Sequence, residues 1–278
     1  MTLIVQKYGG SSLANFDRIR NVANRISNAI TDNQRVVVIV SAMGSMTDDL
    51  IDMAHQISEK PNPREMDALL STGELVSCAL MAMTLNSMGY NAISLSGSQA
   101  GIYTDTTHGK AKISVLSPQR ILDELNNGNV VIVAGFQGVT TDMDVTTLGR
   151  GGSDTTAVAV AAAIGAERCE IYTDVEGVYT ADPKFVPTAR KLEQIGFEEM
   201  LELASYGAKM QPRAVELGLV YNVPIYVASS FTETQGTLIH EGADMIDQNA
   251  VGEVRKKVRG IATDRGFAKI TMLGMPDM

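Results

Sequence analysis

The segment VVVIVSA at residues 36–42 begins with five consecutive Val and Ile residues and ends in Ser41 and Ala42. A strand with one face in water alternates apolar and polar side chains, so an unbroken β-branched run predicts a strand that is covered on both faces. A second run of this kind, NVVIVAGF, occupies residues 129–136. Strands buried on both faces are typical of parallel sheets, and we therefore predict a mainly parallel central sheet with helices on both sides.

The rest of the chain alternates short apolar runs with helical periodicity. Asn15 is expected to cap a helix whose apolar face is formed by Phe16, Ile19, Val22, Ala23, Ile26 and Ile30. Ser117 and Pro118 are expected at the cap and first position of another helix, which Gly128 ends. Further strands are predicted at 3–8, 91–97, 168–175, 224–229 and 236–240. Further helices are predicted at 47–58, 73–88, 156–165, 197–206 and 211–221, with a Pro-rich loop at 61–65.

Composition restricts the class of protein. The 278 residues are 45% hydrophobic and 20% charged, which allows a sizeable core and excludes wholesale disorder. The formal net charge of −9 makes nucleic acid an unfavourable main partner. The N-terminus shows no secretory signal, and apolar stretches such as 157–166 are too short to span a bilayer. We therefore expect a soluble, cytoplasmic protein without a membrane partner.

Cysteine and histidine usage gives no metal or redox signal. Cys78 and Cys169 lie in apolar surroundings and are expected to be buried free thiols. The three histidines, His55, His108 and His240, stand far apart without the spacing of metal ligands. No metal-ligating residue is therefore predicted.

Polar or Gly-rich segments follow several predicted strands, where ligands bind in open α/β sheets. In KYGGSS at 7–12, Lys7 ends a strand and two glycines allow backbone amides to approach a phosphate. A plain strand-to-helix turn with a solvated lysine explains this segment equally well. SAMGSMTDD at 41–49 offers the hydroxyls of Ser41 and Thr47, although an ordinary capped turn also fits.

Two later segments carry charge near predicted helix starts. In STGE at 71–74, a negatively charged Glu74 near a helix start would interact favourably with the helix dipole. This explanation requires no functional role for Glu74. In TLGRGGSDTTA at 147–157, Arg150 precedes a Gly-rich turn and an apolar helix. A guanidinium beside a helix N-terminus can clamp a carboxylate. Flexible glycines at that position are costly without a ligand.

The last two segments lie after residue 170. In YTDVEGVYTADP at 172–183, Asp174 directly follows a strand. It could position a metal ion or orient a lysine, although a simple turn is an equal alternative. In YGAKMQPR at 206–213, Lys209 directly precedes a predicted helix.

In this order, the six segments resemble the motifs of the aspartate kinases, a branch of the amino acid kinase family. The resemblance covers residues 3–240. Four positions depart from the usual motifs: Ser11 replaces threonine, Asp48 replaces asparagine, Glu176 replaces a frequent aspartate and Lys184 stands where arginine is common. No motif charge is lost, although a lysine cannot form a bidentate fork.

The resemblance implies a three-layer αβα sandwich around a largely parallel sheet. It implies transfer of the γ-phosphoryl group of ATP to the β-carboxylate of L-aspartate, with Mg²⁺, giving 4-phospho-L-aspartate and ADP. This reaction is the first committed step towards lysine, threonine, methionine and, in many bacteria, diaminopimelate. Because the acceptor carboxylate is ionised at neutral pH, no general base is required.

The resemblance also assigns roles by position. Lys7 would stabilise the transferring phosphoryl group, and Asp174 would organise the catalytic lysines. The positions that match aspartate-binding residues are Ser41, Thr47, Glu74, Arg150, Gly151, Gly152, Ser153 and Asp154. The positions that match the nucleotide site are Lys7, Tyr8, Gly9, Gly10, Thr173, Asp174, Tyr179, Lys184, Lys209 and Met210. By charge, Arg150 would hold the α-carboxylate of aspartate and Glu74 its α-ammonium.

The C-terminal part departs from the family pattern. We predict a catalytic domain at 1–240, then a polar linker and the first strand of a shortened regulatory ACT domain within 241–278. Feedback inhibition is doubtful without the rest of that region, and a homodimer would be weakened. Two alternatives stay open: another amino acid kinase of the same fold, or an inactive subunit that binds a ligand.

Overall fold

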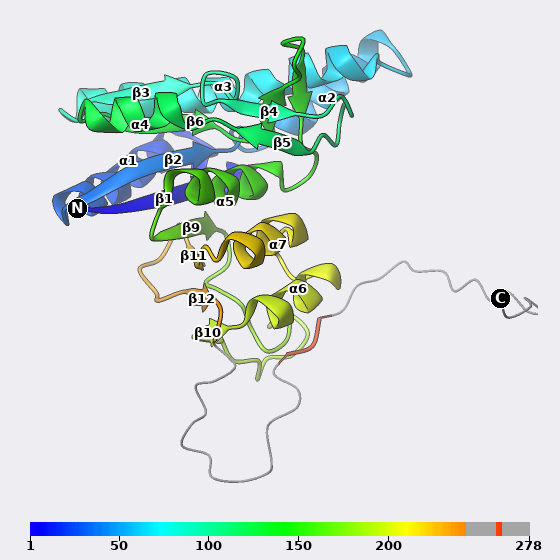
Figure 1. Ribbon diagram of the computed structural model, residues 1–278. Helices are drawn as coiled ribbons and strands as arrows, with labels where there is room; N and C mark the ends of the chain where they lie inside the picture. The colour runs from blue at the N-terminus through cyan, green and yellow to red at the C-terminus, as the bar shows by residue number, and fades with distance from the viewer. Residues whose placement is uncertain (243–259, 263–278) are drawn as a thin grey trace, which may run out of the picture.

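The computed structural model describes residues 1–242 and 260–262 (Figure 1). An eight-stranded sheet runs through it in the order β10-β12-β11-β9-β1-β2-β6-β3. All pairs in this sheet are parallel except β11 with β12. The strands are β1 (Thr2–Tyr8), β2 (Gln34–Val40), β3 (Ala92–Leu95), β6 (Val130–Ala134), β9 (Arg168–Thr173), β10 (Gln194–Ile195), β11 (Ile225–Ser229) and β12 (Thr237–Ile239). The predicted mainly parallel sheet is confirmed.

The two faces of this sheet bury alternate residues of the same strands. Val36, Val38 and Val40 of β2 pack with helices α1 (Phe16–Thr31) and α3 (Pro63–Ser87). Val37 and Ile39 face the opposite layer. That layer consists of α4 (Gln119–Asn126), α5 (Gly152–Ile164), α6 (Phe197–Ser205) and α7 (Pro212–Tyr221). The β-branched runs therefore lie between two helical layers, as the three-layer prediction requires.

Helix α1 begins where Asn15 predicts, because its Oδ1 accepts the backbone N–H of Arg18 at 2.9 Å. The prediction that Phe16 belongs to the apolar face is wrong, since this residue is 63% exposed. The first turn of α1 extends past the edge of the core, whereas Ile19 and Ile26 are buried. Helix α4 begins at Gln119, so Pro118 is the cap and Ser117 precedes it.

Helix α3 corrects two predictions. It begins at Pro63, inside the expected loop, because Pro is favourable at the first helical position and Asn62 Oδ1 accepts the N–H of Arg64 at 2.9 Å. STGE at 71–74 therefore lies in mid-helix, and Glu74 is not near a helix start. With this length, α3 is apolar enough to cross a membrane by composition, unlike the expected shorter helix. Half of that apolar window is buried within the fold, which is typical of a core helix.

A second, four-stranded sheet was not predicted. Its order is β5-β4-β7-β8, and only β4 with β7 is parallel. Its strands are β4 (Ile102–Thr104), β5 (Ile113–Leu116), β7 (Gln137–Val139) and β8 (Val145–Thr147). Each has only three or four residues, too few to show a reliable alternation of side chains. In Figure 1, β4 and β5 lie near α2 (Met46–Ile57) and α3.

The predicted linker and ACT-like strand in 241–278 lie mostly outside the described residues. Gly260, Ile261 and Ala262 are described, and the Ile261 N–H donates to the Thr180 carbonyl at 2.9 Å. This short segment therefore contacts the predicted catalytic domain.

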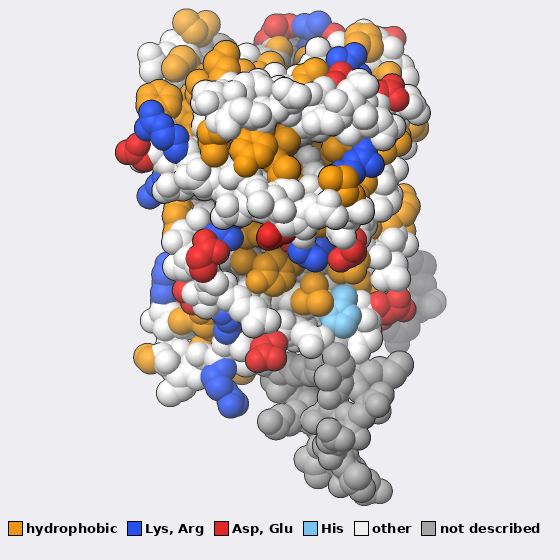
Figure 2. All heavy atoms as spheres, turned by 90° about the vertical axis from the view of Figure 1, so that its left-hand side faces the viewer, with side chains coloured by type: hydrophobic (Ala, Val, Ile, Leu, Met, Phe, Trp, Pro, Cys, Tyr) orange, Lys and Arg blue, Asp and Glu red, His pale blue; other side chains and the backbone are white. Residues whose placement is uncertain are grey.

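The cysteines and the molecular surface agree with the composition. Cys78 and Cys169 are buried free thiols, and burial raises the pKa of Cys78 to about 12. Figure 2 shows a face on which Lys and Arg side chains alternate with Asp and Glu side chains. No continuous basic surface is present on that face.

Candidate active site

Lys7 lies near the carboxyl end of β1, at the centre of the large sheet. Its Nζ is 2.6 Å from Asp154 Oδ1, in the first turn of α5, and both side chains are largely buried. A Cβ built on Gly9 would lie 3.6 Å from this Nζ, at van der Waals contact, so the loop after β1 passes beside the ammonium. The buried pair holds the Lys7 ammonium where the central strand ends, and Asp154 balances its charge.

The loop after β1 runs close to the loop after β2. A Cβ on Gly10 would lie 2.7 Å from the Ala42 carbonyl oxygen, so this approach requires glycine. The Gly10 carbonyl also accepts the N–H of Gly44 at 3.0 Å. The Gly9 N–H donates to the Tyr172 carbonyl at 3.3 Å, and Gly10 and Ser11 are the first residues of η1 (Gly10–Leu13), whose N–H groups have no acceptor within that helix.

Glu74 reaches the same loop from α3. Its Oε1 accepts the Ala42 N–H at 3.1 Å, and a Cβ on Gly73 would lie only 2.9 Å from the Ala42 Cβ. Glu74 Oε2 is buried and has no hydrogen-bond partner among the described residues. Burial raises the pKa of Glu74 to about 7, against the lowering effect of the Ala42 hydrogen bond. An unpaired buried carboxyl oxygen is a ready acceptor for a cationic group.

Arg150 lies in the turn before α5. Gly151 is left-handed at φ 69°, and a Cβ there would lie 2.5 Å from Gln211 Nε2, so only glycine fits. Arg150 is exposed, and its guanidinium has no ion-pair partner among residues 1–242 and 260–262. Gly152 and Ser153 begin α5 and are buried. A free guanidinium beside a helix N-terminus is suited to an anion.

Ser41 and Thr47 lie along the loop between β2 and α2. The Ser41 N–H donates to the Tyr8 carbonyl at 3.1 Å, which fixes the end of β2 beside that of β1. Thr47 is in the first turn of α2, and both residues are half-buried. The structure therefore brings Ser41 to the edge of the sheet that holds Lys7, and Thr47 follows in the first turn of α2. We call Lys7, Glu74 and Asp154 the inner cluster.

A second group of predicted residues surrounds an apolar pocket of about 330 Å³. Its apolar lining includes Val178, Met200, Leu203, Met210, Val227, Ile261 and Ala262. Its polar lining includes Glu176, Tyr179, Asp182, Lys184 and Lys209. We call this the outer pocket, and a flat apolar group with an attached anion fits its lining.

Asp174 connects the outer pocket to the end of β9. Its carboxyl oxygens lie 3.0 and 3.2 Å from Lys209 Nζ, and Thr173 Oγ1 donates to it at 3.2 Å. Burial alone would raise the pKa of Asp174, but the Lys209 hydrogen bond and charge outweigh it and lower the pKa. The Asp174 and Lys209 side chains are about half exposed, so this pair orients an ammonium at the surface.

Tyr8, which is predicted at the nucleotide site, has a fully buried side chain. The Tyr8 side chain is 0% exposed, stacks on Tyr172 at 5.1 Å and donates its hydroxyl to Gln6 at 3.1 Å. Because Tyr8 packs in the layer of α1 and α3, its side chain cannot contact a bound nucleotide. Side-chain alternation along a strand offered this signal, since neighbouring residues such as Lys7 and Tyr8 point to opposite faces of the sheet.

Several residues that line the pocket were not predicted as site residues, and two of them come from the C-terminal segment. Ile261 and Ala262 line it from beyond the expected domain boundary at residue 240. No local signal marks them, because their role depends on the chain returning to Thr180. Among the described residues, no group of three or more His, Cys, Asp or Glu residues is arranged to hold a metal ion by itself.

Comparisons with known proteins identify the family. The amino acid kinase family profile matches residues 2–229. An aspartokinase of Mycolicibacterium smegmatis is 54% identical over all of this chain, which spans 65% of that relative's length. The crystal structure of aspartate kinase from Synechocystis has a TM-score of 0.77 and 48% identity, covering 86% of this chain and 40% of that one.

A third similar protein is E. coli aspartokinase III, solved in complex with aspartate and ADP. It has a TM-score of 0.78 and 29% identity, covering 86% of this chain and 64% of that one. The parallel sheet, the site at its carboxyl edge and these comparisons agree. The chain belongs to the amino acid kinase family.

Proposed function

We propose that this chain binds ATP and L-aspartate and transfers the γ-phosphoryl group to the β-carboxylate, giving 4-phospho-L-aspartate and ADP. The similar proteins named aspartokinase support this activity, and so does the complex of one of them with aspartate and ADP. The observation that carries the proposal is the buried Glu74 Oε2, which has no hydrogen-bond partner among the described residues, together with the buried Lys7–Asp154 pair. An amino-acid substrate would supply the missing cation.

The inner cluster provides complementary charges for aspartate. Glu74 would accept hydrogen bonds from the α-ammonium group, and Arg150 would hold the α-carboxylate. Ser41 and Thr47 would add hydroxyl donors at the same edge. This arrangement leaves the β-carboxylate directed towards Lys7, which is the orientation that the transfer requires.

Lys7 would supply the main electrostatic contribution to phosphoryl transfer. An aspartate carboxylate is already a nucleophile at neutral pH, because its ordinary pKa is about 3.9. The obstacle is repulsion between two anions, which a fixed cation reduces most in the transition state. Asp154 holds the Lys7 ammonium in place at 2.6 Å, so little reorganisation is needed during the reaction.

The outer pocket would bind the nucleotide. Its apolar walls, including Met210, suit the adenine ring, and Lys209 would face the phosphates. Tyr179 and Lys184 line it, Thr173 is the last residue of β9, and Gly10 and Ser11 follow the end of β1. A kinase Mg²⁺ needs only one or two protein carboxylates besides phosphate oxygens, and Asp174 fits that requirement. When bound, Mg²⁺ would neutralise phosphate charge.

Pathway, assembly and location follow from the proposed activity. The reaction would be the first step towards lysine, threonine, methionine and diaminopimelate, in the cytoplasm. Self-association as a homodimer and regulation through an ACT-like region also remain predictions.

The test is ADP release by the 278-residue chain with ATP and Mg²⁺. The acceptor panel holds L-aspartate, L-glutamate, N-acetylglutamate, carbamate and UMP, and hydroxylamine traps acyl phosphates. We expect turnover and a trapped hydroxamate with L-aspartate alone. Turnover with another acceptor would keep the fold and refute the assigned substrate. ATP binding without any turnover would favour the alternative of a ligand-binding subunit.

A further inference from the structure

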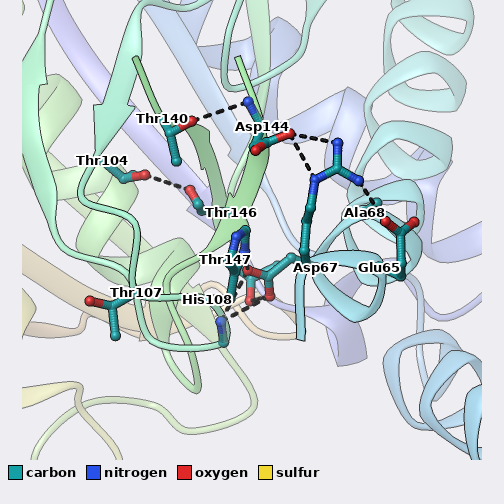
Figure 3. A network of polar contacts seen from close by, with 12 residues as sticks. Glu65, Asp67, Ala68, Thr104, Thr107, His108, Thr140, Asp144, Thr146 and Thr147 are labelled. Carbon is teal, nitrogen blue, oxygen red and sulfur yellow. Dashed lines mark hydrogen bonds and ion pairs between the residues drawn. The ribbon is translucent and has the colours of Figure 1, made fainter. Parts of the chain in front are cut away.

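Asp67 is a fully buried carboxyl group that the mechanism above does not use. It lies on α3, two turns before Glu74. Thr147 Oγ1 donates to its Oδ1 at 2.6 Å, and the Gly109 N–H lies 3.0 Å from both oxygens. His108 Nδ1 lies 2.8 Å from Oδ2. Figure 3 shows His108 and Thr147 gathered around Asp67.

These partners come from two separate segments. Gly109 lies in the turn between β4 and β5, and Thr147 is the last residue of β8. The two segments also contact each other, because the Ala111 N–H donates to the Thr147 carbonyl at 2.9 Å. A Cβ on Gly149 would lie 3.1 Å from the Gly109 carbonyl oxygen. Asp67 therefore joins α3 to both sides of this contact.

The joined segment leads directly into the Arg150 turn. Leu148, Gly149 and Arg150 follow Thr147 without a break. On the other side, the Arg213 guanidinium donates to the carbonyls of Leu148 at 2.9 Å and of Ala111 at 3.0 Å. The Arg150 turn is therefore held between α3 and α7.

Strand β8 is also tied to α3 at its beginning. Arg64 donates to Asp144 through Nε at 2.8 Å and through Nη2 at 2.6 Å, just before the strand starts. These hydrogen bonds raise the pKa of Arg64 and lower the pKa of Asp144. That pair is solvent-exposed and contributes little to stability. The buried Asp67 contact is the one that fixes the end of the strand.

We propose that Asp67 is a positioning residue for amino-acid binding, which acts by holding Thr147 and thereby the Arg150 turn. A buried carboxyl group without a Lys or Arg partner in the described residues is a costly way to stabilise a helix. Its Thr147 donor, however, fixes the start of a loop in which the exposed Arg150 lies between two glycines with positive φ, and its His108 and Gly109 donors hold the neighbouring turn. This inference rests on the proposed function for its effect on aspartate, but not for its effect on the loop.

Two neighbouring threonines provide a matched test. Thr146 and Thr147 are both buried, and each makes an Oγ1 hydrogen bond of 2.6 Å. Thr146 contacts Thr104 within the small sheet, whereas Thr147 contacts Asp67. Thr147→Val and Thr146→Val therefore remove the same group from the same strand, and only the first weakens the proposed support. Asp67→Asn is expected to have the larger effect, because the amide NH2 group of asparagine replaces one carboxyl oxygen that now accepts hydrogen bonds.

The first measurement is hydrogen–deuterium exchange of the full 278-residue chain without ligand. Thr147→Val is expected to speed exchange in residues 148–152 about tenfold, and Thr146→Val less than about twofold. Equal changes in the two variants, or no change in either, would refute the positioning role. This result does not depend on which substrate the protein uses.

The second measurement is steady-state kinetics with ATP and L-aspartate. Thr147→Val should raise the KM for aspartate about fivefold and Asp67→Asn about thirtyfold, with the KM for ATP unchanged within about twofold. Equal increases in both KM values would mean general loosening and would overturn the proposal. If the unmodified chain does not turn over aspartate, the proposed function fails, and the exchange result still decides whether Asp67 holds the turn.

Discussion

The inner cluster and the outer pocket lie at the same edge of the sheet but differ in burial and polarity. Lys7, Asp154 and Glu74 are ionisable and largely buried, and Glu74 Oε2 has no hydrogen-bond partner among the described residues. Around the outer pocket, the charged pair Asp174–Lys209 is about half exposed, and the interior is mainly apolar.

This difference indicates how each region would select its ligand. Buried charges are expensive unless they are compensated, so the inner cluster should favour a ligand that completes its charge pattern. The outer pocket offers apolar area and a screened cation, so it should recognise ring shape and add phosphate affinity. Substitutions in the two regions should therefore affect different kinetic constants.

The largest effect is expected from Lys7→Ala. Removal of the fixed cation should lower kcat about a thousandfold, because its charge is needed most in the transition state. The assay is ADP release at saturating ATP and aspartate, with Lys60→Ala, an exposed lysine, as the control. A loss of less than about tenfold would show that the inner cluster does not carry the chemistry. Lys7→Met gives the same comparison with the side-chain volume retained.

Glu74→Gln should weaken binding and stabilise the free protein. We expect the Kd for aspartate at pH 8, measured by calorimetry, to rise about thirtyfold with the loss of a charged acceptor. Burial raises the pKa of Glu74 from its ordinary 4.5 to about 7, so the folded state binds this proton more tightly than the unfolded chain. The free energy of unfolding should therefore fall as the pH rises between these two values.

The neutral glutamine of that variant removes the free-energy cost of burying a charged carboxylate at this position. At pH 8 we expect it to raise the free energy of unfolding by on the order of 3 kcal/mol, with little change near pH 4.5. Thermal melts at both pH values measure the difference. Glu170→Gln is the control, since both oxygens of Glu170 have hydrogen-bond partners, and it should destabilise instead. Destabilisation by Glu74→Gln at pH 8 would contradict the account.

Lys209→Met should separate the outer pocket from the inner cluster. We expect the KM for ATP to rise about tenfold and the KM for aspartate to stay within about twofold. The melting temperature should change by less than about 2 °C, because exposed ion pairs contribute little to stability. Equal changes in both KM values would show that the two regions do not act separately.

The smallest effect is expected from Lys184→Ala. Lys184 is exposed where it lines the pocket, so its charge is strongly screened by solvent. The KM for ATP should rise less than about threefold in the same assay, and the effect should diminish further in 0.5 M salt (about three times a physiological concentration). A change as large as that of Lys209→Met would extend the binding site to this lysine.

Much of the fold was predictable because its signals are local. The runs at 36–42 and 129–136 predict strands covered on both faces, and the structure places them between two helical layers. The predicted start of α3 was ten residues too late, because a Pro-rich segment can form either a loop or the first turn of a helix. The small sheet was missed because its strands are very short.

For the candidate site, sequence patterns found the segments but not the contacts between them. The Gly-rich turns and charged residues at strand ends identified Lys7, Arg150 and Asp174. Nothing in the sequence indicated that Glu74 would meet the Ala42 amide from mid-helix, whereas side-chain alternation along the predicted strand could have shown that Tyr8 faces away from Lys7.

The sequence by itself determined the strand and helix alternation, the positions of the flexible turns and the charges available to a ligand. These depend on side-chain periodicity and on the conformational freedom of glycine, which act over a few residues. Only the tertiary structure decided which charges are paired and how deeply they lie. Desolvation of Glu74 and the convergence of Asp67 on Gly109 and Thr147 depend on segments far apart in the chain, which no local pattern specifies.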